Sequence, residues 1–139
     1  MPGVKRTLVI IKPDGVERGL VGEILSRFEQ RQFHFVTCEL RTIDEATAKR
    51  HYAEHEGKPF FDRLVTFITS GPSLVIVVEG PDDTWQVVRA MIGATNPTDA
   101  ALGTIRGDLA VEMSQNVIHG SDSSESAQRE ISIFFPTLT

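Results

Sequence analysis

A chain of 139 residues fits one domain with a single hydrophobic core, and we expect that domain to span residues 1–139. Hydrophobic residues make up 40% and charged residues 24%, ordinary values for a globular protein that exclude a disordered or fibrous chain. The 14 Lys and Arg against 19 Asp and Glu give a net charge of −5, the wrong sign for a dedicated nucleic-acid binder. This charge still allows a local cationic pocket.

The sequence shows neither a membrane span nor an export signal. Its longest apolar runs, such as Leu74 to Val78, are too short to cross a bilayer, and the N-terminus lacks the apolar core of a signal peptide. We therefore expect a cytoplasmic protein. Cys38 is the only cysteine, which excludes an intrachain disulfide and a zinc site built from cysteines. Because Cys38 lies in a strand-like segment, we expect a buried thiol.

The beginning of the chain has the pattern of a β-α-β unit. Thr7 to Ile11 is β-branched and apolar and ends at Lys12-Pro13-Asp14-Gly15, where proline and glycine stop the strand, so Lys12 is predicted at a strand end. Apolar residues at helical spacing then predict an amphipathic helix over about 21–28, and a second strand follows around 35–41.

Two helices and a strand are predicted in the middle of the chain. A helix begins at a capping signal, either Thr42 or the rival Asp44, and runs to about residue 54. A second apolar stripe at helical spacing covers 60–68. The continuous apolar run 73–78 predicts a strand that is central in the sheet or well covered.

The last part of the chain is predicted as a helix over 83–92, a long irregular segment, a short strand at Val117 and Ile118, and a closing helix over 123–134. From 93 to 115, Gly, Pro, Thr, Asn and Asp recur at close intervals. A compact domain rarely keeps so long an irregular segment without a role, so we expect a functional loop there.

This order of elements indicates an α/β chain of the α+β type. We expect a ferredoxin-like split β-α-β arrangement, in which helices cover a four-stranded, mostly antiparallel sheet. A doubly wound parallel sheet is the competing arrangement, but neither G-x-G-x-x-G nor G-x-x-x-x-G-K-[ST], the phosphate motifs that would support it, occurs. Any phosphate must therefore be bound by side chains.

A single histidine, His119, lies between a short apolar run and a predicted helix start. The ordinary pKa of histidine, about 6.5, leaves much of the imidazole neutral and nucleophilic near pH 7. Gly120 removes a side chain that would crowd an approaching substrate. The segment therefore suits covalent chemistry, with a structural turn residue as the alternative.

Cations and donors are predicted at the ends of several elements. They are Lys12 at a strand end, Arg89 near a helix end, and Thr95 and Arg106 in the long loop. Guanidinium groups match phosphate oxygens in a bidentate way, lysine supplies a point charge, and a threonine hydroxyl adds a donor. Each residue alone could be an ordinary surface side chain, but together they indicate a polyphosphate site.

Four segments of the sequence carry the most specific signal: Thr7–Val16, Gly93–Pro97, Gly103–Asp108 and Asn116–Ser123. Together they resemble the nucleoside diphosphate kinase family over nearly the whole chain. The single residues that join them at the family's positions are Tyr52, Phe60, Leu64, Arg89 and Glu130.

This resemblance implies transfer of the γ-phosphate of a nucleoside triphosphate, typically ATP, to a nucleoside diphosphate, which maintains the NTP and dNTP pools. The transfer would be ping-pong, through phosphorylated His119. The resemblance also implies Mg²⁺ as cofactor, held by the nucleotide phosphates and by no protein ligand.

The resemblance assigns catalytic roles to a few residues. His119 would attack the γ-phosphorus with Nδ1 while Glu130 supports the other ring nitrogen, and Lys12 and Tyr52 would lie close to the transferring group. Ser121 would bond near the histidine, and it could also share a helix cap with its neighbours.

The implied nucleotide contacts involve phosphates, sugar and base. The residues are Arg89, Thr95 and Arg106 for the phosphates, Lys12 and Asn116 for the sugar hydroxyls, and Phe60 and Met113 for the two faces of the base. Stacking on an aromatic ring suits any nucleobase, so broad specificity is expected.

Members of this family form homo-oligomers, usually hexamers and in some bacteria tetramers, and the resemblance does not choose between them. The loop around 97–107 is expected to take part in assembly. The sequence ends at Thr139, soon after Phe134-Phe135-Pro136, so we expect the contacts of the longer C-terminal arm of some relatives to be replaced.

Two other functions are considered. The segment His51 to His55 matches H-x-x-E-H, the pattern of inverted zinc peptidases, and would place two histidines one turn apart on a helix. Those peptidases are far larger, a third ligand is needed, and Gly57 ends the helix; His55 could instead reach the nucleotide phosphates. The other alternative, a non-catalytic nucleotide-binding or assembly module, would keep the cations but leave His119 unused.

Overall fold

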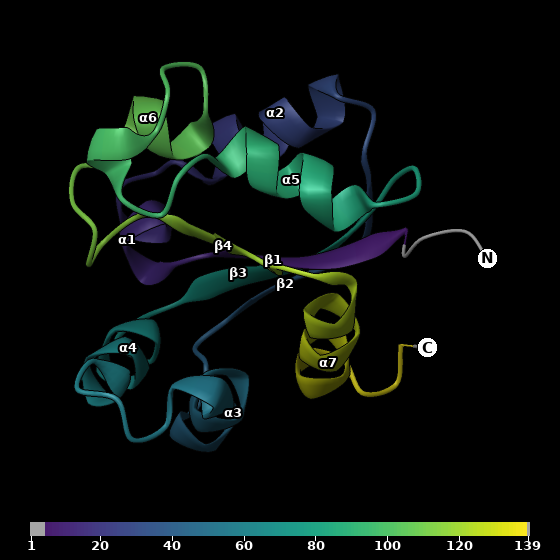
Figure 1. Cartoon of the computed structure of the whole chain (residues 1–139). Helices are drawn as coiled ribbons and strands as arrows, with labels where there is room; N and C mark the ends of the chain where they lie inside the picture. The colour runs from purple at the N-terminus through teal and green to yellow at the C-terminus, as the bar shows by residue number, and fades with distance from the viewer. Residues whose placement is uncertain (1–4, 139) are drawn as a thin grey trace.

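One four-stranded sheet forms the centre of the computed structural model, which describes residues 5–138. The strands lie in the order β2-β3-β1-β4, and every neighbouring pair is antiparallel (Figure 1). They are β1 (Arg6–Ile11), β2 (His34–Arg41), β3 (Ser73–Glu79) and β4 (Ile118–Gly120). Residues 1–4 and 139, which the predicted domain and the signal-peptide argument include, lie outside the described residues.

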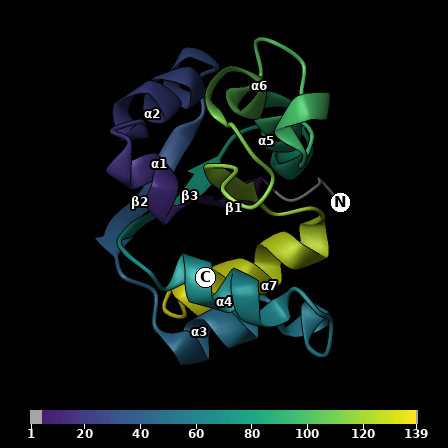
Figure 2. The same ribbon diagram turned by 90° about the vertical axis from the view of Figure 1, so that its left-hand side faces the viewer.

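Helices cover both faces of this sheet. They are α1 (Pro13–Glu17), α2 (Val21–Gln30), α3 (Glu45–His51), α4 (Phe61–Ile68), α5 (Thr84–Ile92), α6 (Ile105–Leu109) and α7 (Ser124–Phe134), with 3-10 turns η1 (Ala53–His55) and η2 (Pro97–Asp99). Helices α2, α5 and α6 lie over one face and α3, α4 and α7 over the other, as Figures 1 and 2 show. The predicted α+β sheet is confirmed, and the parallel alternative is excluded by the strand pairing. Within residues 5–138, no helix has the length and apolar character that a bilayer span requires.

The hydrophobic core has two parts, one on each face of the sheet. Alternate residues of β1 point to opposite faces, so Val9 and Ile11 belong to one part while Leu8 and Ile10 belong to the other. All four are fully buried. A strand covered on both faces has a continuous apolar sequence, which is why β1 and β3 have that pattern and why the predicted central place of β3 is confirmed.

Cys38 corrects a prediction. It lies on β2 and is exposed, together with its neighbours Glu39 and Leu40. The predicted buried thiol is therefore wrong. Because β2 is an edge strand that pairs only with β3, it is covered less than a central strand. A strand-like pattern identifies a strand but does not say where the strand lies in the sheet.

Several boundaries also differ from those predicted. Helix α3 begins after Asp44, whose carboxylate accepts from the Thr47 N–H at 3.1 Å, so Asp44 and not Thr42 is the cap. The same helix ends at His51, before the predicted residue 54. The expected irregular segment contains η2 and α6, and Val117 lies outside β4 because its φ is +74°.

Candidate active site

His119 lies in the middle of β4, opposite Ile10 of β1. Ile118 and Gly120 on either side are buried, whereas the His119 side chain keeps 20% of its surface exposed. A Cβ on Gly120 would lie only 2.7 Å from Ile92 Cδ1, so glycine at this position allows α5 to pack against β4. Close packing between helix and strand is thus one reason for glycine here, and room for a substrate stays a prediction.

Glu130 holds the imidazole of His119 from α7. Its Oε1 lies 2.8 Å from His119 Nε2 and accepts a hydrogen bond from Ser121 Oγ, also at 2.8 Å. Burial opposes ionisation of Glu130, but its hydrogen bonds with His119 and Ser121 hold its pKa below the usual value. An ionised carboxylate can only accept, so Nε2 carries a proton in this contact. Of the residues named from the sequence, Glu130 thus contacts the His119 ring and Ser121 contacts Glu130.

His51 is a buried residue of the site whose role the sequence analysis missed. It is 3% exposed, and its ring lies edge-on to that of His119, with ring centroids 4.7 Å apart and an interplanar angle of 85°. Burial, with a further contribution from His119, lowers the pKa of His51 to about 3, so this imidazole is neutral near pH 7. Ala48 and His51 are three residues apart and therefore lie on one face of the helix. This spacing was the sequence signal that could have predicted the burial of His51.

The H-x-x-E-H motif does not form the predicted pair of ligands. Helix α3 ends at His51, and His55 lies in the following 3-10 turn η1. Among residues 5–138, the group that could hold a metal ion is His51, His119 and Glu130, whose ligand atoms lie within 4.8 Å of one another. The ligand atoms of His51 thus lie close to those of His119 on β4, and His55 is not part of this group.

Arg106 is the most buried cation of the site, with 3% of its surface exposed. Helix α6, capped by Thr104, carries it. Its guanidinium donates to the carbonyl of Ile118 at 2.6 Å, of Gly93 at 3.3 Å and of Asn116 at 3.4 Å. Arg106 therefore connects the long loop to the start of β4 through hydrogen bonds. No sequence pattern predicted these contacts.

A hydrogen bond between Lys12 and Asn116 connects the end of β1 to the segment just before β4. Lys12 follows β1, as predicted, and its Nζ donates to Asn116 Oδ1 at 2.9 Å. The amide of Asn116 in turn donates to the carbonyl of Thr95 at 3.0 Å. Burial and then the nearby Arg106 lower the pKa of Lys12 to about 8, while Asp14 acts in the opposite direction.

The predicted phosphate-binding cations are gathered around β4. Arg89 of α5 donates to the Gly120 carbonyl at 3.0 Å, next to His119. Arg106 contributes to the lowered pKa of Lys12, and Arg89 adds to burial in lowering the pKa of Arg106 to about 10. These cations are close enough to repel one another, so a chain of net charge −5 contains a local cationic site. Thr95 joins the site through its backbone, and its side chain is exposed.

The remaining predicted residues differ in exposure. Tyr52 is 9% exposed, and burial, with a smaller contribution from Glu130, raises the pKa of its hydroxyl. Phe60 is 40% exposed, with its ring centroid 5.3 Å from that of His55. Met113 is 60% exposed. Phe60 and Met113 thus present apolar surface that the chain itself does not cover.

An imidazole held through Nε2 by a carboxylate, with lysine and arginine side chains nearby, defines a site for reaction with an anionic phosphoryl group. The fold and the site together are those of an α+β phosphotransferase. Residues 5–139 match the family model described as nucleoside diphosphate kinase. The chain belongs to the nucleoside diphosphate kinase family.

Individual proteins show the same similarity. A nucleoside diphosphate kinase of Chloroflexus aurantiacus is 58% identical over 132 residues, which cover 95% of this chain and 87% of the relative. One from a Parafrankia species is 55% identical over 135 residues, covering 97% and 98%. A solved structure of the halophilic enzyme of Halobacterium salinarum, in complex with CDP, superposes with a TM-score of 0.91 at 51% identity and covers 94% of this chain and 87% of that one.

The predicted family and the predicted activity are confirmed by these comparisons. The chain has the function of a nucleoside diphosphate kinase, and its reaction class is phosphoryl transfer. The zinc peptidase and the non-catalytic module were the alternatives to this activity. Neither has support from the family match or from the geometry of the H-x-x-E-H segment.

Proposed function

We propose that this nucleoside diphosphate kinase works by a ping-pong mechanism in which His119 carries the phosphoryl group. The observation that supports the proposal most is the 2.8 Å contact between His119 Nε2 and Glu130 Oε1, which orients a partly exposed ring and puts a proton on Nε2. Ser121 donates to the same carboxylate oxygen and so fixes its position. In the neutral imidazole with this tautomer, Nδ1 is the nucleophile.

Two half-reactions follow from this arrangement. In the first, the Nδ1 lone pair forms a bond to the γ-phosphorus, the bond from phosphorus to the β,γ-bridging oxygen breaks, and a nucleoside diphosphate leaves with that electron pair. In the second, a terminal β-phosphate oxygen of another nucleoside diphosphate attacks the phosphorus and the P–N bond breaks. The Nε2 proton stays on the ring throughout, hydrogen-bonded to Glu130, whose charge stabilises the phosphorylated imidazole.

Arg106, Arg89 and Lys12 are proposed to stabilise the charge on the transferring phosphoryl group. They surround β4, and two of them have a lowered pKa through burial and mutual repulsion. An anionic ligand would relieve that repulsion, which is a physical reason for phosphate binding at this site. Tyr52 is proposed to lie beside the same group, and Thr95 to add a donor.

Mg²⁺ is the proposed cofactor, and the side chains present fit a metal that the nucleotide itself carries. The group His51, His119 and Glu130 offers two nitrogens and one carboxylate, whereas Mg²⁺ prefers oxygen ligands. We therefore propose that Mg²⁺ binds through the nucleotide phosphates. When bound, it would neutralise part of their charge.

The sugar and base are proposed to bind beside the phosphates. Lys12 and Asn116, joined at 2.9 Å, would present an ammonium and an amide to the sugar hydroxyls. The exposed faces of Phe60 and Met113 would contact the base without reading its edges. This supports broad base specificity and a role in maintaining the NTP and dNTP pools.

Self-association is proposed through the loop 97–107. Leu102 in this loop is 88% exposed, a large apolar surface that a second copy of the chain would cover. A homohexamer is the favoured state, and a homotetramer is the alternative; analytical ultracentrifugation distinguishes them by mass. A cytoplasmic location is proposed on the resemblance alone, and cell fractionation tests it.

The first experiment is incubation of the protein with γ-labelled ATP and Mg²⁺, followed by a GDP chase, for the wild type and His119→Ala. A label that acid removes, alkali leaves in place and GDP accepts, and that is absent from the variant, supports His119 as the carrier. Absence of label on the wild type, or an equal label on the variant, removes His119 from this role. The enzyme would then transfer phosphate directly or through another residue.

A further inference from the structure

Val117, next to the active-site strand, has a strained backbone conformation. Its φ is +74°, a value that β-branched residues rarely adopt. The N–H of Ile118 donates across it to the carbonyl of Asn116 at 2.8 Å, the hydrogen bond of a γ-turn. The positive-φ form of this turn is rare and strained, and it persists only where neighbouring groups hold it.

This turn fixes the direction of the residues on both sides of it. On one side lies Asn116, whose amide is bonded to Lys12 and to the Thr95 carbonyl. On the other side β4 begins at Ile118 and carries His119 one residue later. If Val117 relaxed to a negative φ, the angle between these two sides would change and both functional side chains would move.

Asp14 of α1 holds the turn from outside the strand. Its Oδ2 accepts from the Val117 N–H at 3.0 Å, while the Lys12 N–H donates to the Val117 carbonyl at 2.8 Å. Both backbone groups of Val117 are thus bonded to the segment that follows β1. Gly15 permits the approach, because a Cβ there would lie 2.8 Å from Ile11 Cγ2 and 3.1 Å from the Val117 carbonyl oxygen.

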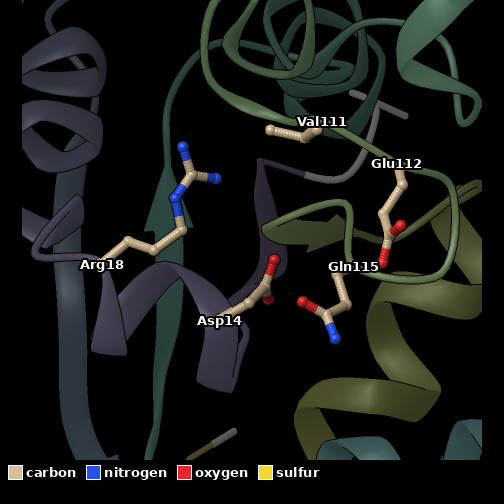
Figure 3. Close-up of a pocket in the computed structure, with 5 residues that line it drawn as sticks. All are labelled: Asp14, Arg18, Val111, Glu112 and Gln115. Atoms are coloured by element: carbon tan, nitrogen blue, oxygen red, sulfur yellow. The ribbon is translucent and has the colours of Figure 1, made fainter.

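The surroundings of Asp14 give its carboxylate no other protein partner among residues 5–138. It is 7% exposed, and Oδ1 is buried without a hydrogen-bond partner there. Figure 3 shows Asp14 at the edge of a pocket of about 250 Å³, which is also lined by Arg18, Val111, Glu112 and Gln115. Burial of a carboxylate costs free energy. Among residues 5–138, the hydrogen bond from the Val117 N–H is the side-chain hydrogen bond that offsets this cost for Asp14.

We propose that Asp14 is a positioning residue for phosphoryl transfer, because it holds the strained turn at Val117 that sets Asn116 and His119 relative to each other. Asp14 contacts no reacting atom, and the sequence analysis assigned it only to a strand-ending turn. The inference rests on the proposed use of His119 as phosphoryl carrier.

The test uses Asp14→Ala, Asp14→Asn, Val117→Gly and the double variant Asp14→Ala/Val117→Gly, with the rate of labelled phosphoenzyme formation as readout. Asp14→Ala is expected to slow this rate by about 10- to 100-fold, the effect of a small misplacement of reacting groups. Glycine adopts a positive φ without strain, so the double variant is expected to recover most of the lost rate. Val117→Gly alone also removes a fully buried side chain, so its rate is the reference with which the double variant is compared.

The charge of Asp14 gives a second readout that a purely structural role would not change. Asp14→Asn keeps an oxygen acceptor for the Val117 N–H but removes an anion near Lys12, which also has the cationic Arg106 as neighbour. Asp14 opposes the lowering of the Lys12 pKa, so the alkaline fall of kcat/KM is expected to move to lower pH in this variant. Asp14→Asn is also the variant to use if Asp14→Ala does not fold.

The outcomes separate the two proposals. A wild type that forms no labelled phosphoenzyme refutes the use of His119, whatever the Asp14 variants do. A labelled wild type overturns the positioning role of Asp14 in either of two cases: folded Asp14→Ala is labelled at the wild-type rate, or Asp14→Ala slows Val117→Gly as much as it slows the wild type. Circular dichroism and thermal unfolding of each variant establish that it is folded.

Discussion

Glu130 Oε1 and His119 Nε2 lie 2.8 Å apart, although one residue belongs to α7 and the other to β4. The carboxylate is 4% exposed because α7 packs its apolar face against the sheet and turns Glu130 toward β4. A hydrogen bond from an imidazole N–H to a buried carboxylate fixes both the tautomer and the orientation of the ring. This contact is the basis of the first prediction.

Glu130→Ala should slow phosphoenzyme formation by about 100-fold, because the His119 ring loses the acceptor that keeps a proton on Nε2 and orients the ring. Rapid-quench measurement with labelled ATP gives the rate. The matched control is Glu125→Ala, an exposed carboxylate in the first turn of the same helix, which should leave the rate unchanged. Equal rates for the two variants would contradict the supporting role of Glu130.

Arg106→Lys should lower the free energy of unfolding by about 1–3 kcal/mol, because an ammonium cannot reach all the carbonyl oxygens that the guanidinium satisfies. It should also slow turnover, since the long loop loses its tie to β4. Urea denaturation and steady-state kinetics measure the two effects. Arg31→Lys, at an exposed arginine after α2, serves as control. An unfolding free energy within error of the wild type would show that the hydrogen bonds of the buried Arg106 guanidinium do not stabilise the fold.

The activity should depend on the protonation of Lys12. Its folded pKa is lowered to about 8, so kcat/KM, which reports the free enzyme, should fall as the pH rises through about 8. Because the folded pKa lies below the usual 10.5, the unfolded chain binds more protons between these values, and this group makes stability rise with pH from about 8 to 10.5. Opposite trends in activity and stability are therefore expected. Lys12→Met should remove both pH effects, whereas the exposed Lys49→Met should keep them.

Stability in acid should depend on His51. Its pKa is lowered from 6.5 to about 3 in the folded protein, so the unfolded chain binds an extra proton between these pH values and stability falls as the pH decreases through that range. His51→Phe should make the stability curve flatter there, when unfolding by urea is followed from pH 7 to pH 4. His34→Phe, an exposed histidine on β2, should leave the slope unchanged. A slope that persists in His51→Phe would assign the acid sensitivity to the carboxylates.

Much of the fold could be predicted from local patterns. The apolar runs of β1 and β3 and the helical spacing of α2, α4 and α7 all gave elements close to those observed. The short helices α1 and α6 were missed, because five residues are too few for a periodic pattern. Cys38 was predicted to be buried but is exposed, because the sequence of one strand does not show whether that strand lies at the edge of the sheet.

The candidate site was predicted with uneven success. His119, Lys12 and Asn116 were named from motifs and Glu130 from the family resemblance, and the structure brings His119 into contact with Glu130 and Lys12 into contact with Asn116. His51 was assigned to the wrong partner. Its partner His119 lies 68 residues further along the chain, and periodicity contains no information about such a distant contact.

The sequence by itself determined the residue types of the site, the family and most of the regular elements, because these depend on local periodicity and on motifs within short segments. Only the tertiary structure decided which groups touch: Glu130 with His119, Arg106 with the Ile118 carbonyl, and Asp14 with the strained Val117. These contacts form when sheet pairing and helix packing bring distant segments together. Their geometry depends on burial and register, which the order of residues does not display.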